Sequence, residues 1–251
     1  MLQTILQLEE RFDTDKVAFC FDSHASKRKQ IYPTYKANRK NRQPMTAEEE
    51  KFEEEYQRQI YKLRKEYLPE IGFRNVFWQS GYESDDLIAR LAMDFTLSNC
   101  FPERVHREGV IVSADHDLYQ CITGHIQFYN FKGVMTLQRF KQETGLVPSQ
   151  WVAVKSIAGC STDNVQGIKG VGEKTAIKYL LRKLKPSSKA YRSIEAGKAI
   201  IERNKKLTRL PLPGVIIHSL YGDEITKEGW DSTCRKLGFN SLRGKYPRIA
   251  R

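Results

Sequence analysis

The chain has 251 residues, 40% of them hydrophobic and 29% charged, which is typical of a globular protein large enough to bury a core. Its five cysteines form no C-x-x-C pair and no apolar run is long enough to span a bilayer, so the sequence argues against a disulfide framework, a structural zinc site and a membrane protein. The net charge of +12 favours a polyanionic partner, nucleic acid first, with plain solubility charge as the alternative.

The predicted elements begin with a helix over residues 2–12 and a short buried strand, VAFCF, that ends at Asp22. Residues 23–45 are rich in Lys, Arg and Tyr and almost bare of aliphatic side chains, which predicts a surface element. Thr46 starts a long charged helix through a capping box, and Pro69 is expected to end it.

Further along, strand and helix patterns alternate as FRNVFWQ, SDDLIARLAMDF, VIVS, HDLYQCI and HIQFYNF. This alternation predicts βαβ units with a parallel sheet, and hence an α/β fold. After about residue 135 helical patterns dominate, interrupted by the glycine cluster GIKGVG. We therefore expect an α/β domain over residues 1–135 and a helical lobe over residues 136–251.

Acidic residues follow three of the predicted strands. They are Asp22, then Glu83, Asp85 and Asp86, then Asp115 and Asp117. Each alone is explained as well by a helix start, but the carboxyl ends of parallel strands meet at one edge of a sheet. Converging carboxylates repel one another unless a cation neutralises them, and hard oxygen ligands select Mg²⁺ or Mn²⁺. Two such ions about 4 Å apart clamp a phosphodiester, so the pattern predicts a nuclease.

The segment RKQIYPTYKANRK interleaves cations with two tyrosines. Cations that hold phosphates and rings that stack on unpaired bases suit a groove for single-stranded nucleic acid, whereas a disordered basic loop is the alternative.

Glycines also precede a helix predicted to start near Glu173, in DNVQGIKGVGEKTAIKYLL. Glycines permit close backbone approach and the helix start attracts phosphate, which suits binding to a nucleic-acid backbone regardless of sequence. A tight turn between helices is the competing interpretation.

Taken in order, the motifs FDS, YPTYKANR, ESDD, SADHDLYQ and DNVQGIKGVGEKTA resemble those of the bacteriophage and bacterial 5′ nucleases, the flap endonuclease and 5′-3′ exonuclease family, over about residues 1–185. The resemblance implies a PIN-like α/β nuclease domain, its parallel sheet flanked by helices, with a helical arch over residues 23–68 that grips or threads the 5′ strand. It also implies a helix-three-turn-helix in the helical DNA-binding lobe, which holds duplex DNA with a monovalent cation such as K⁺.

The resemblance carries over to individual residues. The implied ligands of two Mg²⁺ or Mn²⁺ ions are Asp22, Glu83, Asp85, Asp86, Asp115, Asp117 and Asp163. Lys36 and Arg39 are the implied catalytic residues that position the scissile phosphate, a role that their charge and reach support. The implied DNA contacts are Arg28, Tyr35, Lys36, Arg39, Gly167, Lys169, Gly170, Gly172, Lys174 and Thr175.

Two departures from the family pattern stand out. A strand ending in aspartate usually precedes a helix like that of residues 2–12, and this sequence starts at the helix. Because buried ladder groups need partners, we expect that strand to come from elsewhere, whether through a start codon assigned too late, a separately encoded segment or a cloned fragment. Cys160 stands where the family has aspartate in GDxxDN, and a soft thiol is expected to weaken the second metal site, toward slower or Mn²⁺-dependent cleavage.

Together these features predict a metal-dependent, structure-specific nuclease that cleaves 5′ flaps or 5′ ends of DNA during replication or repair. We expect a monomeric phage protein in the cytoplasm of a bacterial host. The alternative is a DNA-structure-binding protein of the same fold with weakened catalysis, and action on RNA or RNA-DNA hybrids stays open.

Overall fold

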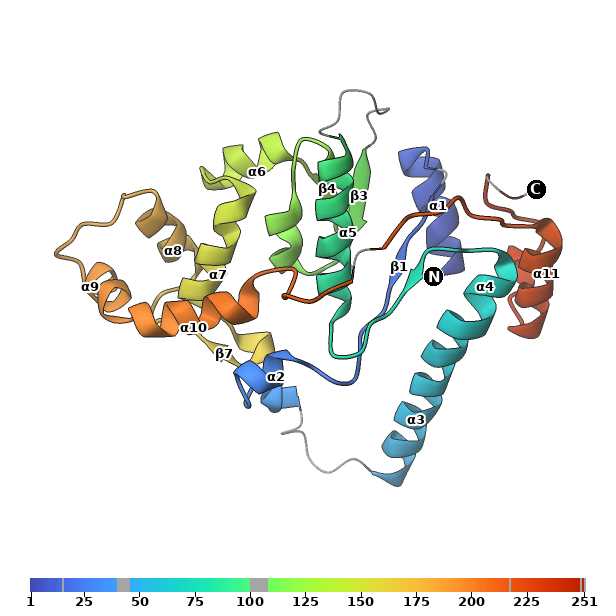
Figure 1. Cartoon of the computed structure of the whole chain (residues 1–251), viewed down its shortest axis with the longest axis horizontal. Helices are drawn as coiled ribbons and strands as arrows, with labels where there is room; N and C mark the ends of the chain where they lie inside the picture. The colour runs from blue at the N-terminus through green and yellow to red at the C-terminus, as the bar shows by residue number, and fades with distance from the viewer. Residues whose placement is uncertain (15, 40–45, 100–107, 217, 249, 251) are drawn as a thin grey trace. The chain divides into compact units, whose positions relative to one another are not determined.

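The structure is a computed structural model that describes residues 1–14, 16–39, 46–99, 108–216, 218–248 and 250 (Figure 1). The chain divides into two units by its internal contacts. Unit 1 comprises Met1–Asp22, Gln43–Trp78 and His218–Arg251, and unit 2 comprises Ser23–Arg42 and Gln79–Ile217. The predicted domain boundary after residue 135 lies inside unit 2, because elements on both sides of it share one hydrophobic core.

Unit 1 is a helical body with a short parallel strand pair. Its elements are α1 (Leu2–Phe12), β1 (Phe19–Cys20), α3 (Ala47–Lys62), the π-helical turn η2 (Leu63–Tyr67), α4 (Leu68–Ile71), β2 (Val76–Phe77), α11 (Lys227–Lys236) and the 3-10 helix η6 (Asn240–Leu242). β1 pairs with β2 in parallel, with Phe19 opposite Val76. The core is apolar and contains the fully buried Trp230, so this unit brings both ends of the described chain onto one cluster.

Two local predictions in unit 1 are confirmed, and one is wrong. Helix α1 covers residues 2–12, and the Thr46 and Glu49 capping box is present. The helix that follows does not end at Pro69 but continues through η2 and α4 to Ile71, where Gly72 ends it with φ of 108°. Pro69 lies in the first turn of α4, directly after the π-helical turn, where the missing N–H and the ring are tolerated.

Unit 2 contains a three-stranded sheet covered by helices. Its sheet and the elements around it are α2 (Arg28–Ile31), the 3-10 helix η1 (Ala37–Arg39), α5 (Ser84–Asn99), β3 (Gly109–Val112), the 3-10 helix η3 (His116–Cys121), β4 (Ile126–Tyr129), β5 (Val134–Met135) and α6 (Leu137–Thr144). β3 pairs with β4 in parallel, Gly109 opposite Ile126, as the βαβ pattern predicts. β5 adds an antiparallel strand that the sequence analysis did not identify.

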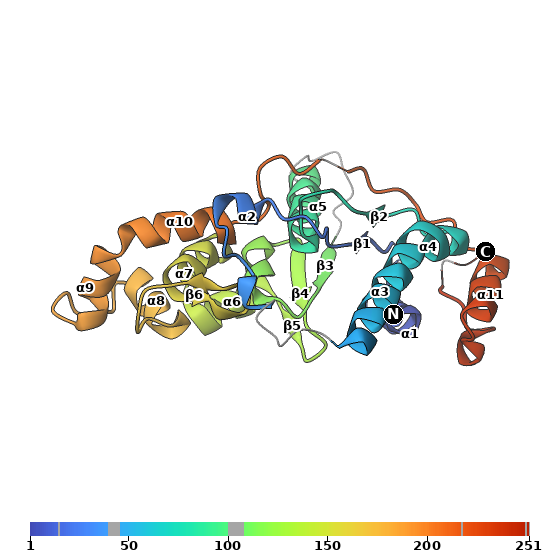
Figure 2. The ribbon, with the colours of Figure 1, turned by 90° about the horizontal axis from the view of Figure 1, so that it is seen from below.

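The second half of unit 2 is mainly helical. It contains the 3-10 helix η4 (Pro148–Gln150), α7 (Trp151–Ala158), β6 (Gly159–Cys160), the 3-10 helix η5 (Ser161–Asp163), β7 (Val165–Gln166), α8 (Glu173–Leu180), α9 (Lys189–Ala196) and α10 (Lys198–Thr208). α7 and α10 lie side by side (Figure 2). β6 and β7 form a small antiparallel pair, and α8 begins at the predicted residue.

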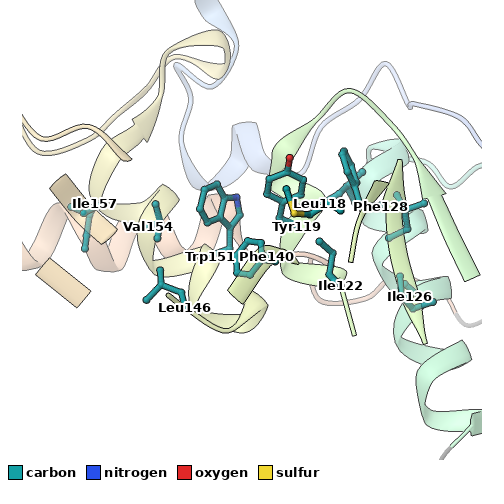
Figure 3. Close-up of a cluster of buried hydrophobic side chains, with 14 of the residues drawn as sticks. Leu118, Tyr119, Ile122, Ile126, Phe128, Phe140, Leu146, Trp151, Val154 and Ile157 are labelled. Carbon is teal, nitrogen blue, oxygen red and sulfur yellow. The ribbon is translucent and has the colours of Figure 1, made fainter. Parts of the chain in front are cut away.

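One aromatic-rich core joins these two halves (Figure 3). Tyr119 from η3 packs edge-to-face on Phe128 of β4 and Phe140 of α6, with ring centroids 4.8 and 5.9 Å apart. Trp151 at the start of α7 lies 5.6 Å from the Phe140 ring. Burial of such rings is the main apolar stabilisation of a domain, so the sheet edge and α7 are held in a fixed relation. In the described part of the chain, no helix combines the length and apolar character needed to cross a membrane.

Candidate metal centre and nucleic-acid interface

Acidic side chains from separate segments of unit 2 line one pocket. Glu83 and Asp85 come from the start of α5, Asp115 and Asp117 from the start of η3, and Asp163 from the end of η5. Tyr35, Arg28 and Cys160 complete much of the remaining wall. Of the acids that the sequence analysis expected to converge after separate strands, Glu83, Asp85, Asp115 and Asp117 line this pocket, and Asp163, which the family resemblance implied, joins them.

Asp115 shapes the turn that presents the central acids. It follows β3, and its Oδ1 accepts the backbone N–H of Asp117 at 2.8 Å, which caps the 3-10 helix η3. The backbone N–H of Asp115 in turn donates to Ser113 Oγ at 3.0 Å. An N-cap carboxylate satisfies helix donors that would otherwise lack partners. This capping directs Asp117 into the pocket.

Asp117, Cys160 and Asp163 form the tightest group, because one ligand atom of each lies within 4.8 Å of the others. Asp117 Oδ1 is buried, and the Lys155 ammonium lies 2.9 Å from it. Burial raises the pKa of Asp117, an effect that nearby Lys155 partly offsets and Asp115 reinforces. Carboxylates that converge in an enclosed place repel one another unless cations neutralise them, so this group fits a metal ion. Burial also raises the pKa of the Cys160 thiol, so this position offers sulfur in its weakly ligating form.

Besides Arg28, which also lines the pocket, three cations from this unit approach the acids. Lys36 Nζ lies 2.7 Å from Glu83 Oε2 and 3.8 Å from Asp163 Oδ1, and Arg39 donates to the same Asp163 oxygen at 2.9 Å. Lys155 Nζ lies 2.9 Å from Asp117 Oδ1. The Lys36 and Arg39 side chains are 21% and 58% exposed, so both predicted catalytic cations border solvent while touching the acids.

The basic segment is docked onto η5 by its backbone. The Lys36 backbone N–H donates to the Asp163 carbonyl at 2.8 Å. The side-chain amide of Asn164 donates to the Thr34 carbonyl at 2.7 Å. Lys36 adopts φ of 55°, a left-handed conformation that is rare for residues other than glycine. Such conformations persist where the surroundings determine them, so the lysine is held over the acids rather than free to rotate away.

Tyr35 was predicted to contact DNA, and the structure buries it among carboxylates. Its residue exposure is 3%, and its hydroxyl donates to Glu83 Oε2 at 3.1 Å and to Asp163 Oδ2 at 3.3 Å. Burial raises the pKa of Tyr35, and the charges of Glu83 and Asp163 raise it further, so the hydroxyl keeps its proton. Tyr35 thus bridges two of the predicted ligands.

Arg28 and Asp86 form a buried two-pronged ion pair. Arg28 donates to both Asp86 oxygens at 2.6 and 2.8 Å, and the two residues are 2% and 0% exposed. Asp86 also accepts the backbone N–H groups of Glu83 and Leu212. Burial acts to lower the pKa of Arg28, but its bond to Asp86 and the charges of Asp86 and Glu83 outweigh that and raise it. Arg28 therefore faces carboxylates rather than solvent, and the Asp86 oxygens are engaged by protein donors.

The segment between β7 and α8 requires glycine at some positions for steric reasons. A Cβ on Gly167 would lie 2.2 Å from the Ala158 carbonyl, so only glycine fits there. Gly170 has φ of 77°, whereas a Cβ on Gly172, the N-cap of α8, would meet nothing within 4 Å. Lys169 and Lys174 are exposed and Thr175 is half-buried in the same stretch, which leaves the predicted DNA contacts of the hairpin open to a ligand.

Asp22, also a predicted ligand, is the last residue of unit 1, so its role stays a prediction. Lys155 was not identified from the sequence. The available signal was a lysine within the apolar run WVAVKSIA, where a charged side chain requires partners when buried.

Comparison with known proteins identifies the family. Residues 1–147 match the model of the family described as 5′-3′ exonuclease, N-terminal resolvase-like domain. The chain belongs to this 5′-3′ exonuclease family. One relative is the thermostable DNA polymerase I of Thermus caldophilus, which is 31% identical to this chain over 243 residues. The match covers 90% of this chain and 26% of that protein. The 5′-3′ exonuclease of Bacillus subtilis is 30% identical over 187 residues, covering 71% of this chain and 56% of that protein.

A solved structure of the bacteriophage T5 flap endonuclease, in a pseudo-enzyme-product complex with DNA and metal ions, is similar with a TM-score of 0.66 and 21% identity, covering 83% of this chain and 79% of that one. This likeness and the family match confirm the predicted PIN-like α/β fold. The chain spans about a quarter of the length of the DNA polymerase I relatives.

Proposed function

We propose that this chain is a metal-dependent, structure-specific 5′ nuclease that cleaves phosphodiester bonds in 5′ flaps or from 5′ ends of DNA, in replication or repair. The observation that carries the proposal is the convergence of carboxylates from α5, η3 and η5 in one pocket of a chain with a net charge of +12. Relatives described as 5′-3′ exonucleases and a phage flap endonuclease solved with DNA and metal ions support it.

Mg²⁺, or Mn²⁺ in its place, is the proposed cofactor. The residues that would hold it are Glu83, Asp85, Asp115, Asp117 and Asp163, all from unit 2. When bound, such an ion lowers the pKa of water and stabilises charge on a leaving oxygen. The convergence of Asp117 and Asp163, whose ligand atoms lie with that of Cys160 within 4.8 Å of one another, supports this assignment.

The protein's own cations are proposed to handle the phosphate. Lys36 and Arg39 touch the acids from the solvent side, so each can turn to a scissile phosphate that arrives there and stabilise the charge that develops on it. Tyr35 would orient the carboxylates of Glu83 and Asp163 through its hydroxyl.

We assign Arg28 and Asp86 a supporting role, in place of DNA contact and metal ligation. Each is almost fully buried and each is engaged by the other. The pair fixes the first turn of α5 through the N–H of Glu83, and thereby positions the neighbouring ligands.

The proposed partner is DNA bound through its backbone. Exposed Lys169 and Lys174 and the open side of Gly172 form a surface on which phosphates can approach the start of α8, where a monovalent cation such as K⁺ is also proposed. We further propose a monomer acting in the bacterial cytoplasm, and a labelled RNA-DNA hybrid competing with duplex DNA would measure any preference between them.

A labelled 5′-flap duplex tests the function. With Mg²⁺ or Mn²⁺ we expect cleavage near the junction, and we expect Asp85→Asn and Asp115→Asn each to abolish it while flap binding persists. Glu143→Gln, an exposed carboxylate paired with Arg139 on α6, is the matched control and should cleave normally. Cleavage that survives both pocket substitutions would refute the proposal.

One observation favours the second candidate, a DNA-structure-binding protein with weakened catalysis. Cys160 contributes a thiol to the group formed with Asp117 and Asp163, where a hard ion prefers oxygen. This candidate predicts salt-sensitive flap binding with no product under either divalent ion.

A further inference from the structure

Lys155 is a buried cation beside the Asp117, Cys160 and Asp163 group of the candidate metal centre. It lies in α7 between Val154 and Ser156, both fully buried, and the residue itself is 8% exposed. Trp151 and Ile157 anchor the same helix in the apolar core, so the lysine cannot turn outward without rotating α7. A charged side chain at such a position is retained only where it has specific partners.

Those partners are two carboxylates on different elements. Lys155 Nζ lies 2.9 Å from Asp117 Oδ1 at the start of η3 and 3.0 Å from Glu173 Oε1 at the start of α8. The Asp117 side chain is 14% exposed and that of Glu173 is 45% exposed. The ammonium is therefore directed at the enclosed acid on one side and at a more solvated acid on the other.

The ammonium lies against the tightest group of potential ligands. Asp117 Oδ1, the atom nearest the ammonium, belongs to the residue that converges with Cys160 and Asp163. Two carboxylates carry two negative charges, and Lys155 already neutralises one of them. The third position is sulfur, hydrogen-bonded to Thr162 Oγ1 at 3.0 Å, which is a poor ligand for Mg²⁺. A divalent ion bound by this group would thus have two carboxylates and no third oxygen ligand from it, and it would be repelled by the fixed positive charge of Lys155.

We propose that the Lys155 ammonium takes the place of one of the two divalent cations, so that the centre binds a single ion through its remaining carboxylates. This inference rests on the proposed function and deepens it. Lys155 is a positioning residue: it holds Asp117 and supplies permanent positive charge beside it, where two metal ions would otherwise share the carboxylates. Cys160 and Lys155 act in the same direction, since a thiol brings no ligand charge and the ammonium brings a positive one, and both lower the affinity for a second divalent ion.

Counting bound Mn²⁺ in the full chain without DNA, by electron paramagnetic resonance, tests the proposal. We expect one bound ion in the wild type. Cys160→Asp combined with Lys155→Met should bind two ions with a spin-coupled signal. The first substitution adds an oxygen ligand, and the second removes the ammonium that occupies the place of the second ion. Cys160→Asp alone should bind the second ion at least about tenfold more weakly than the double variant does, since the ammonium stays.

Glu173→Gln is the matched control. It removes the other partner of Lys155 but leaves the ammonium beside Asp117, so the wild-type count of one should persist. If Lys155 serves only as a tether between α7 and α8, Lys155→Met and Glu173→Gln will lower the melting temperature alike, and the double variant will still bind one ion. That result would overturn the proposal.

Two further outcomes distinguish failure of this inference from failure of the proposed nuclease function. Two ions in the wild type would overturn the inference and leave the nuclease assignment intact. No Mn²⁺ bound by the wild type or by any variant would overturn both. If the double variant with methionine does not fold, Lys155→Gln with Cys160→Asp keeps a polar group toward Glu173, and its ion count decides in the same way.

Discussion

Lys36 Nζ lies 2.7 Å from Glu83 Oε2, so a residue of the basic segment rests directly on a candidate metal ligand. The contact is fixed from the backbone, since the Lys36 N–H also donates to the Asp163 carbonyl. This arrangement couples the segment predicted to hold the substrate strand with the acids predicted to cleave it. When a phosphate enters the pocket, the same ammonium can transfer from carboxylate to phosphate with little movement.

Lys36→Ala is therefore expected to lower turnover far more than affinity. A single charge that acts on the developing phosphate charge is worth about 10²-fold in turnover, whereas flap affinity should change by less than about threefold. Single-turnover cleavage and fluorescence anisotropy on one labelled flap measure the two quantities. Lys29→Ala, an exposed lysine of the neighbouring α2, is the control. An equal loss in both quantities would make Lys36 a docking residue only.

The buried pair of Arg28 and Asp86 makes a stability prediction. Arg28→Met leaves the Asp86 carboxylate buried without its cation, which is expected to lower the free energy of unfolding by about 3–5 kcal/mol. Adding Asp86→Asn removes the uncompensated charge and should recover part of the loss. Urea denaturation followed by circular dichroism provides both values.

Arg139→Met supplies the comparison for that pair. Its ion pair with Glu143 is about half exposed on both sides, so its loss should change stability by less than about 1 kcal/mol. Equal effects of Arg28→Met and Arg139→Met would mean that the buried pair contributes no more than a surface pair does.

Helix spans and helix caps, which depend on neighbouring residues, could be predicted from the sequence, whereas features that depend on contacts between distant segments could not. The span of α1, the Thr46 cap and the start of α8 follow from spacing, capping chemistry and glycine placement, and all are confirmed. Acids after separate strands were expected to converge because such strand ends share a sheet edge. Four of them do line one pocket, but β2 before Glu83 and β3 before Asp115 pair in different sheets of the described chain, so a shared edge is not the reason. The contact-based units could not be predicted in this way, because each is assembled from segments far apart in the chain.

The candidate site shows the same limit at single residues. Arg28 and Tyr35 belong to a segment with the composition of a DNA-binding surface. Their burial against carboxylates depends on α5 and η5, which are distant in the sequence. Lys155 reaches Asp117 from another helix, so neither motif nor spacing indicates the pair. The continuation of the charged helix past Pro69 depended on a π-helical turn, which has no reliable sequence signal.

The open side of Gly172 makes a prediction about the DNA interface. Gly172→Ala fits without a clash, since its Cβ would meet nothing within 4 Å, but the methyl group would occupy the surface on which a phosphate approaches α8. We expect duplex affinity to fall about fivefold, the value of one hydrogen bond worth about 1 kcal/mol, with an unchanged melting temperature. Gly124→Ala, equally unobstructed but in the turn before β4, is the control for filter-binding measurements. Full affinity in Gly172→Ala would argue against backbone contact at this position.

Glu9 makes a prediction about pH. It is 1% exposed in unit 1, where its Oε2 accepts the Arg248 N–H at 3.1 Å and its Oε1 meets no donor from the described residues. Burial raises the pKa of Glu9 above its ordinary value of 4.5, against the lowering effect of Arg248. Because the folded state holds the proton more tightly than the unfolded chain, the stability that Glu9 contributes is complete below the unfolded pKa and is lost as pH rises through the folded pKa.

Glu9→Gln should therefore gain stability relative to the wild type in the pH window above its ordinary pKa of 4.5, because the amide has no charge to bury. Urea denaturation at several pH values in that window measures the difference in free energy of unfolding. Glu10→Gln, on the exposed side of the same helix, should show a much flatter difference. If the Glu9→Gln difference stays constant across the window, ionisation of Glu9 does not oppose folding and the acid is better solvated than its burial indicates.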